Sequence, residues 1–137
     1  MRVFLCLVLA AAVVTPVAAA RPGSAPTCGS YSVGPGTHTA GNAKGARCLL
    51  QQFARCKSAS YRLSRFGVDT VAVDDFTVAN ADGHCFVSVQ TSTRVVPQQA
   101  KPGPTLFCAK LAARGGDVVA VNCTGGTAKT LSLTGRS

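Results

Sequence analysis

Residues 76–89, with the sequence FTVANADGHCFVSV, decide the fold, because they combine a tight turn with two alternating strands. Asp82-Gly83 at the centre tolerate positive φ, as a two-residue hairpin turn requires. A hairpin centred there pairs Asn80 with Cys85, Val78 with Val87, and Phe76 with Val89. The large apolar members of these pairs then share one face. The stretch therefore predicts an antiparallel sheet with one buried face.

The flanking sequence predicts further strands on both sides of this hairpin. Residues 61–65 and 68–73 flank Phe66-Gly67, which we interpret as a tight turn. The alternation breaks near Asp74-Asp75, where a β-bulge would restore the register. On the C-terminal side we expect a strand that ends at 96, a loop over 97–104, a hairpin turning at Gly115-Gly116, and an edge strand through Leu131 and Leu133.

Residues 43–56 predict a single helix. At 100° per residue, one side of it is apolar and the other is polar. The apolar side comprises Ala46, Leu49, Leu50, Phe53 and Cys56, and the polar side Lys44, Arg47, Gln51 and Arg55. We therefore expect an α+β fold over 43–137, with one amphipathic helix packed on a four- to five-stranded antiparallel sheet and stapled by disulfides.

The first twenty residues are typical of a secretory signal peptide. Arg2 supplies the positive charge, residues 3–14 form a short apolar run, and Ala18-Ala19-Ala20 supply small residues before the cleavage site. We expect cleavage after Ala20, export to the extracellular space, and no membrane span in the mature chain. Residues 21–42 are rich in Gly and Pro and predict an extended N-terminal arm.

The mature chain keeps six cysteines, which in an exported domain predict three disulfides. Counting outward from Gly115-Gly116 brings Cys108 opposite Cys123, which favours a cross-strand bridge. Cys56–Cys85 would join the helix end to the central hairpin, and Cys28–Cys48 would join the arm to the helix. Six cysteines allow fifteen connectivities, so these pairs remain hypotheses. No C-x-x-C pair is present, and neither a metal nor another cofactor is expected.

The charge of the chain is strongly basic. The formal net charge is +9, there is no Glu, and removal of the signal leaves thirteen Lys and Arg against five Asp. Such a field attracts anionic partners such as acidic proteins or anionic surfaces. The residues proposed for this surface are Lys44, Arg47, Arg55, Arg62 and Arg65. The alternative is a basic surface that only keeps the protein soluble. Tyr61 and Phe66 lie beside Arg62 and Arg65, as stacking aromatics in a nucleic-acid site would, but Tyr61 also fits the core pattern of its strand. We therefore expect no specific nucleic-acid binding.

A series of short motifs resembles a known group of proteins. Cys48 and Cys56 bound a C-x7-C helix, which is followed by Gly67-Val68-Asp69-Thr70, Phe76-Thr77-Val78 and Gly83-His84-Cys85. This order resembles a family of small exported bacterial Cys-rich domains of uncharacterised function, over residues 46–123. The likeness implies a fold and no activity. Residues 36–38 and 108–117 are also similar to short stretches of bacterial subtilisin inhibitors.

Catalytic motifs are not recognisable in the sequence. His38 lies in the Gly-rich arm and His84 follows a turn, so nothing places them on one reacting atom. Asp74-Asp75 lack the further oxygen ligands that calcium requires, so we interpret them as solvated acids at the bulge. No serine has a nucleophile-elbow context. We therefore expect no enzymatic activity.

Three functions remain as hypotheses. The first is a secreted, non-enzymatic binding or structural domain with an unknown partner. The second is a secreted protease inhibitor, in which a rigid loop (97–104, or Lys57-Ser58-Ala59) fills a protease cleft. The third is a small secreted hydrolase that acts on an anionic polymer through His38 and His84.

Overall fold

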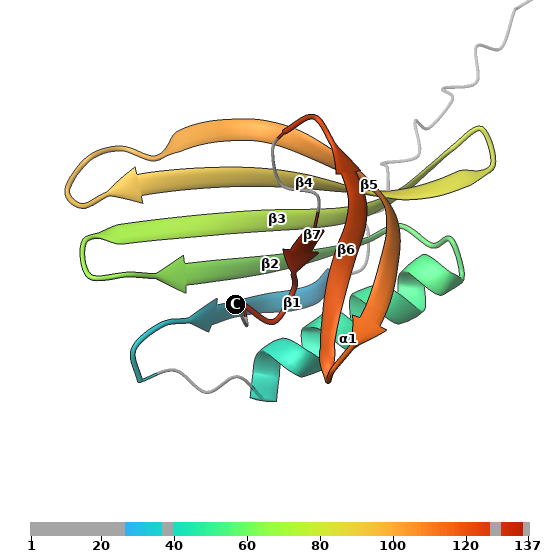
Figure 1. Cartoon of the computed structure of the whole chain (residues 1–137), viewed down its shortest axis with the longest axis horizontal. Helices are drawn as coiled ribbons and strands as arrows, with labels where there is room; N and C mark the ends of the chain where they lie inside the picture. Colours follow the sequence, from blue (N-terminus) through green and yellow to red (C-terminus); the bar gives the residue numbers. More distant parts are fainter. Residues whose placement is uncertain (1–26, 37–39, 127–129, 136–137) are drawn as a thin grey trace, which may run out of the picture.

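A computed structural model describes residues 27–36, 40–126 and 130–135 of the chain. It contains a single sheet in which the strands lie side by side in sequence order (Figure 1). The elements are β1 (Thr27–Val33), α1 (Ala40–Ala54), β2 (Ala59–Phe66), β3 (Thr70–Ala81), β4 (His84–Val95), β5 (Lys101–Arg114), β6 (Asp117–Thr124) and β7 (Thr130–Ser132). In this described part of the chain, no helix is long and apolar enough to cross a membrane.

The predicted α+β class is wrong, because the protein is mostly sheet. Strands make up 63% and the helix 13%, and the seven strands form a mixed, curled half-barrel. The four- to five-stranded antiparallel prediction missed β1, which lies in the predicted arm and pairs parallel to β2. The connection between these two parallel strands is α1, as expected for a helical crossover. The prediction from the sequence also missed that β5 begins at Lys101, inside the predicted loop 97–104.

The central hairpin is confirmed. Across β3 and β4, Asn80 pairs with Cys85, Val78 with Val87, and Phe76 with Val89. The bulge predicted at Asp74-Asp75 is absent, and β3 runs without interruption from Thr70 to Ala81. No bulge is needed because Asp74 faces the buried side of the sheet, where it is 1% exposed. We call this side, which packs on α1, the inner face, and the other side the outer face.

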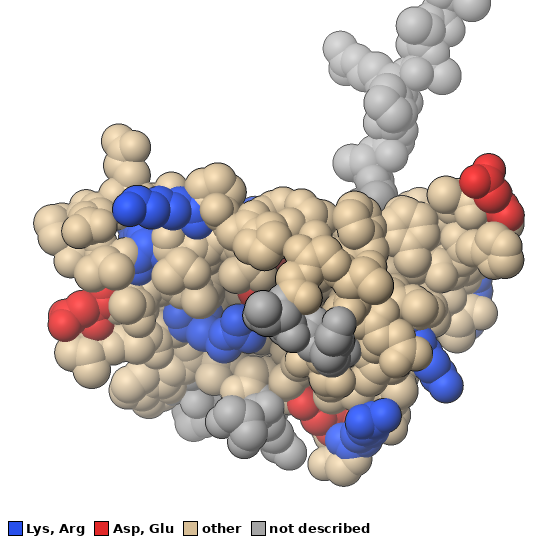
Figure 2. All heavy atoms as spheres, turned by 45° about the horizontal axis from the view of Figure 1, so that its top comes forward, with Lys and Arg blue, Asp and Glu red and all other residues tan. Residues whose placement is uncertain are grey.

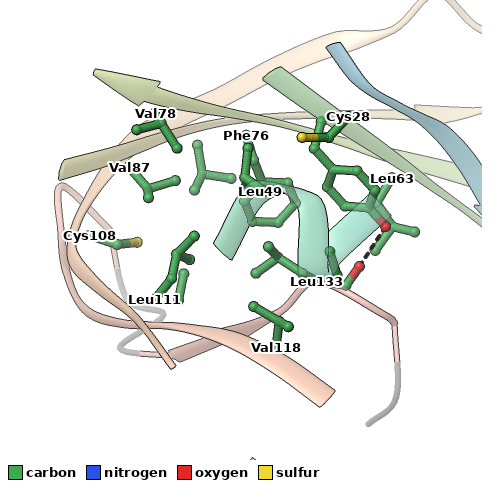
Figure 3. Packing of buried hydrophobic residues seen from close by; sticks show 14 of the residues in the cluster. Cys28, Leu49, Leu63, Phe76, Val78, Val87, Cys108, Leu111, Val118 and Leu133 are labelled. Carbon is green, nitrogen blue, oxygen red and sulfur yellow. Dashed lines mark hydrogen bonds between the residues drawn. The ribbon is translucent and has the colours of Figure 1, made fainter. Parts of the chain in front are cut away.

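The core lies between α1 and the inner face (Figure 3). Leu49 of α1 is fully buried among Phe76, Val87 and other residues of the sheet. Tyr61 is also buried, and its hydroxyl donates a hydrogen bond to the carbonyl oxygen of Leu133 at 2.7 Å. This bond holds the C-terminal segment beyond β7 against β2. Burial, and then the neighbouring Tyr31, raises the pKa of Tyr61 well above its ordinary value.

A bend in β5 and β6 closes the half-barrel over the helix. The inner-face residues of β5 step from Cys108 to Leu111, an odd interval that interrupts the alternation. On β6 the same step runs from Cys123 to Ala120, and Asn122 between them has a φ of 57°. Both strands therefore turn at the same level, and the ends of β5 and β6 cross over α1 (Figure 1).

Three disulfides staple the fold, and they join the pairs favoured from the sequence. Cys28–Cys48 joins β1 to α1, Cys56–Cys85 joins the end of α1 to β4, and Cys108–Cys123 crosses from β5 to β6. The helix ends in a Schellman arrangement. The amide of Lys57 donates to the carbonyl of Gln52, and the amide of Cys56 donates to that of Phe53. Cys56 is left-handed there, with a φ of 52°.

Gly45 sets the distance between α1 and the sheet. A Cβ at this position would lie 2.6 Å from Cε2 of Tyr61 and even closer to Cε2 of Tyr31. In an exposed helix interior, Gly→Ala stabilises by about 1 kcal/mol. Here we expect Gly45→Ala to destabilise by about 1–3 kcal/mol, because the helix must move away from two packed rings.

Denaturant unfolding checks this sign reversal, with Gln51→Ala on the exposed side of α1 as the control. We expect the control to stay within about 0.5 kcal/mol of the wild type. A Gly45→Ala protein as stable as the wild type, or more stable, would contradict the close packing of α1 on the two tyrosines.

Candidate functional site

Two hairpin ends lie side by side at one end of the sheet. The turn between β2 and β3 (67–69) and the loop between β4 and β5 (96–100) both lie at the left of Figure 1. The amide of Val96 donates to the carbonyl of Asp69 at 2.9 Å, so the two ends are joined directly. Each end is also closed internally, by Gly67 N–H to the carbonyl of Thr70 and by Gln98 N–H to that of Val95. We call residues 66–69 and 95–98 the paired tips.

The paired tips are the most apolar exposed part of the described chain. Of its five exposed large hydrophobic residues, four lie here: Phe66 (42% exposed), Val68 (96%), Val95 (45%) and Val96 (54%). The fifth, Phe107, lies on β5 away from the tips, against Phe86. Single exposed apolar residues are ordinary, but four of them on two hairpin ends joined by a hydrogen bond indicate a site of interaction.

A groove opens on the outer face directly beside the tips. It has a volume of about 340 Å³ and is lined by Ser64, Phe66, Val71, Val73, Ser92, Arg94 and Ala100. These residues come from β2, β3, β4 and the β4–β5 loop, so one rigid sheet region holds most of them. The volume is at the small end of the range for ligand sites. Apolar surface therefore continues from the tips into a shallow depression.

The charge of this end is positive. Arg94 and Lys101 lie on the two strands that lead into the β4–β5 loop, and both are exposed. Among the described residues, the ion pairs are Arg62–Asp75 and Arg65–Asp74, and neither includes Arg94 or Lys101. Asp69 is the acid in the tips themselves. An acidic partner could therefore pair with Arg94 and Lys101 without displacing a carboxylate of the described residues.

A buried polar cluster on the inner face supports the base of the tips. Asp74 of β3 accepts a hydrogen bond from Thr91 Oγ1 of β4 at 2.8 Å. Its other oxygen lies 2.6 Å from Nη2 of Arg65 on β2. This second oxygen has no hydrogen bond of acceptable geometry, so its stabilisation is mainly by charge. The cluster ties three neighbouring strands together just behind the exposed apolar residues. The earlier interpretation of Asp74-Asp75 as solvated acids is therefore wrong for Asp74.

The basic residues singled out in the sequence do not form one surface. Lys44 and Arg47 lie on α1, and Arg55 directly follows it. Arg62 lies on the outer face paired with Asp75, and Arg65 lies on the inner face paired with Asp74. Arg62 and Arg65 are separated by strand alternation, because two residues of β2 that lie an odd number of positions apart face opposite sides of the sheet. On the side drawn in Figure 2, Lys and Arg are spread out rather than gathered into one patch.

The other candidate residues are also separated. Of the two loops considered for protease inhibition, 97–104 begins at the paired tips, whereas Lys57-Ser58 follows α1 next to the Cys56–Cys85 bridge. His38 lies outside the described residues. His84 begins β4, at the opposite end of that strand from Val95. Within 27–36, 40–126 and 130–135, no three His, Cys, Asp or Glu side chains gather as metal ligands would.

Sequence reasoning missed the apolar residues of the tips. The pattern predicts that Val68 begins one strand and that Val95-Val96 end another. A signal was present in Val95-Val96-Pro97, because two successive valines before a proline cannot both face a core. The bond from Val96 to Asp69 joins positions 27 residues apart in the chain, and no local pattern predicts it.

Searches with this chain among protein-family models, curated proteins and solved structures find no match. The resemblance to exported Cys-rich domains, and the weaker one to subtilisin inhibitors, therefore remain predictions.

Proposed function

We propose that this chain is a secreted, non-enzymatic domain that binds a protein partner through the paired tips. The observation that carries the proposal is the gathering of four exposed apolar side chains on two hairpins joined by a hydrogen bond. A rigid apolar ridge loses little conformational freedom on binding, which favours affinity. The three disulfides are compatible with an extracellular protein.

Charge supports a protein partner with an acidic rim. Interfaces commonly have an apolar centre and a polar edge. Here Val68 and Val96 would form the centre, and Arg94 and Lys101 would form part of the edge. Such edge cations increase the rate of association with an acidic partner and make it sensitive to salt.

Protease inhibition is the second candidate, and the pairing of the tips favours it. Two rigid hairpin ends held side by side form a projecting ridge that could enter a cleft without being ordered on binding. Titration of the oxidised mature protein against trypsin, subtilisin and papain tests this function. Stoichiometric inhibition that is lost in a tip variant would support it, and no inhibition at micromolar excess would argue against a general inhibitor of these classes.

The binding function predicts a separation of stability from binding. We expect Val68→Ser with Val96→Ser to change the free energy of unfolding by less than about 1 kcal/mol, because both side chains are already exposed. Affinity for the partner should fall roughly tenfold or more, since residues at the centre of an interface dominate its energy.

The measurement is capture from the extracellular fraction of the source organism, on immobilised wild type, the Val68→Ser/Val96→Ser variant and a Phe107→Ser control. The control removes a half-exposed apolar residue away from the tips. A protein retained by the wild type and the control but lost by the tip variant supports the proposal. A protein retained equally by all three, or lost equally by both variants, would place the binding surface elsewhere.

A further inference from the structure

The groove beside the tips has two unlike walls. In the register of the sheet, Phe66 of β2, Val71 of β3 and Arg94 of β4 lie in one row across three neighbouring strands. All three belong to the outer face, and all three line the groove. Neighbouring strands are about 4.8 Å apart, so Phe66 and Arg94 stand roughly 10 Å apart with the short Val71 between them. One wall is therefore an aromatic ring and the other a guanidinium group.

The floor continues along β3 away from the tips. The next row of the outer face is Ser64, Val73 and Ser92, all short side chains. The row after that contains Arg62 and Asp75, which form a bidentate ion pair across β2 and β3. The groove is thus open at the tips and ends at a neutralised pair. Ser64 and Ser92 can donate or accept hydrogen bonds at either side of its floor.

The two arginines on this face differ in what they can bind. Arg62 already holds the carboxylate of Asp75 through Nε and Nη2, at 2.5 and 2.9 Å. Arg94 is in neither of the two ion pairs found within the described residues. A guanidinium group presents a planar set of donors that matches a carboxylate. The groove therefore combines an apolar floor with a cation whose carboxylate partner is not supplied by the described chain.

We infer that this groove is the subsite for an extended acidic segment of the partner, in which an apolar side chain packs on Phe66, Val71 and Val73 and a neighbouring carboxylate pairs with Arg94. This inference rests on the proposed protein-binding function and names the chemistry of the partner. The tips supply an apolar contact with the partner, and the groove next to them binds an apolar side chain and an adjacent carboxylate of the same partner. A peptide segment fits because the depression is shallow and open at the tips, and because its serines can bond to a backbone.

A matched pair of peptides tests this subsite in the intact, oxidised mature domain. The probes are acetyl-Leu-Glu-Leu-amide and acetyl-Leu-Gln-Leu-amide, which differ by one charge, and the measurement is an amide chemical-shift titration. We expect the Glu peptide to shift the amides of Val71, Val73 and Ser92, and to bind at least about fivefold more tightly than the Gln peptide, as a charge-assisted pair would. Absence of shifts at these amides would overturn the inference.

Variants assign the preference to its residues. Arg94→Gln should remove the difference between the two peptides, whereas Lys110→Gln, at another exposed cation on β5, should keep it. Phe66→Ala should weaken both peptides equally. Equal binding of the two peptides by the wild type, or a preference that survives Arg94→Gln, would overturn the assignment to Arg94.

The same variants distinguish failure of this inference from failure of the proposed function. Val68→Ser/Val96→Ser leaves the groove residues unchanged and should keep peptide binding while it loses the captured partner. If capture depends on the tips but the peptides do not bind in the groove, the subsite alone is wrong. If the peptides bind as expected but no partner depends on the tips, the proposed docking mode is wrong and the groove stands.

Discussion

Replacing Arg65 by methionine is expected to lower the free energy of unfolding by about 2–3 kcal/mol, because it leaves the carboxylate of Asp74 buried without its counter-charge. Asp74 is 1% exposed, whereas 37% of the Arg65 side chain is exposed. The loss should therefore fall at or below the lower end of the range for fully buried pairs, since water can approach where the guanidinium was. Thr91 still donates to Asp74, but a single hydroxyl does not neutralise a charge.

Neutralising Asp74 instead of Arg65 is expected to lower the free energy of unfolding by a smaller amount. In Asp74→Asn, Arg65 keeps its exposure to water and can be solvated, and the Asn side-chain oxygen can still accept the bond from Thr91. We expect a loss of about 1 kcal/mol, in the range for one weakened polar interaction. The double variant Arg65→Met/Asp74→Asn should be more stable than Arg65→Met alone, because no buried charge remains.

Urea unfolding of the four proteins completes a double-mutant cycle. Three outcomes each contradict a charge-stabilised cluster behind the tips: equal losses for the two single variants, a double variant as unstable as the sum of both, or no loss for Arg65→Met. Because this cluster joins β2, β3 and β4, amide exchange at Val71 and Val95 should also accelerate in Arg65→Met.

Replacing Phe76 by alanine should have the largest effect on stability, about 3–5 kcal/mol. Phe76 is fully buried at the centre of the inner face (Figure 3), and its ring centroid lies 5.8 Å from that of Tyr61. In the sheet it lies between Tyr61 of β2 and Val89 of β4. The cavity left by the ring would be bounded by strands on both sides and by the core beneath α1, so little of it can collapse.

Phe107→Ala is the matched control, since it removes the same atoms from the same sheet. Phe107 is 49% exposed on the outer face, and its loss is limited to contacts such as that with Phe86. We expect Phe107→Ala to lower the free energy of unfolding by less than about 1 kcal/mol. Thermal or denaturant unfolding of both variants measures the difference. Similar losses of stability at Phe76 and Phe107 would contradict the assignment of the inner and outer faces, and with it the position of the groove on the outer face.

The sequence was sufficient where the determining interaction is local. Asp82-Gly83 admits the positive φ values of 52° and 78° that this turn requires, and the pairing from Phe76 to Val89 follows by counting. The amphipathic pattern of 43–56 likewise predicted α1, which spans 40–54. Cys108 opposite Cys123 also followed from a turn, at Gly115-Gly116.

The predictions from the sequence failed where the interaction partner of a residue is distant in the chain. Residues 27–33 contain Gly and Ser and have no strong strand pattern. They form β1 because they pair with the edge of β2, which follows α1 in the chain. The sequence predicts a solvated acid at Asp74, because a carboxylate is rarely buried unless it is paired. Its partners, Arg65 and Thr91, lie on two other strands, and only the register of the sheet brings them to it.

By itself, then, the sequence determined the central hairpin, the helix and the apolar alternation that gives the sheet one buried face, because these depend on backbone preferences over a few neighbouring residues. Only the tertiary structure decided the functional surface. The turn with Phe66 and Val68 lies beside the loop with Val95 and Val96 because β2–β3 and β4–β5 end at the same level of one sheet. The groove has Phe66 facing Arg94 for the same reason: lateral strand pairing, not sequence proximity, sets which side chains share a row.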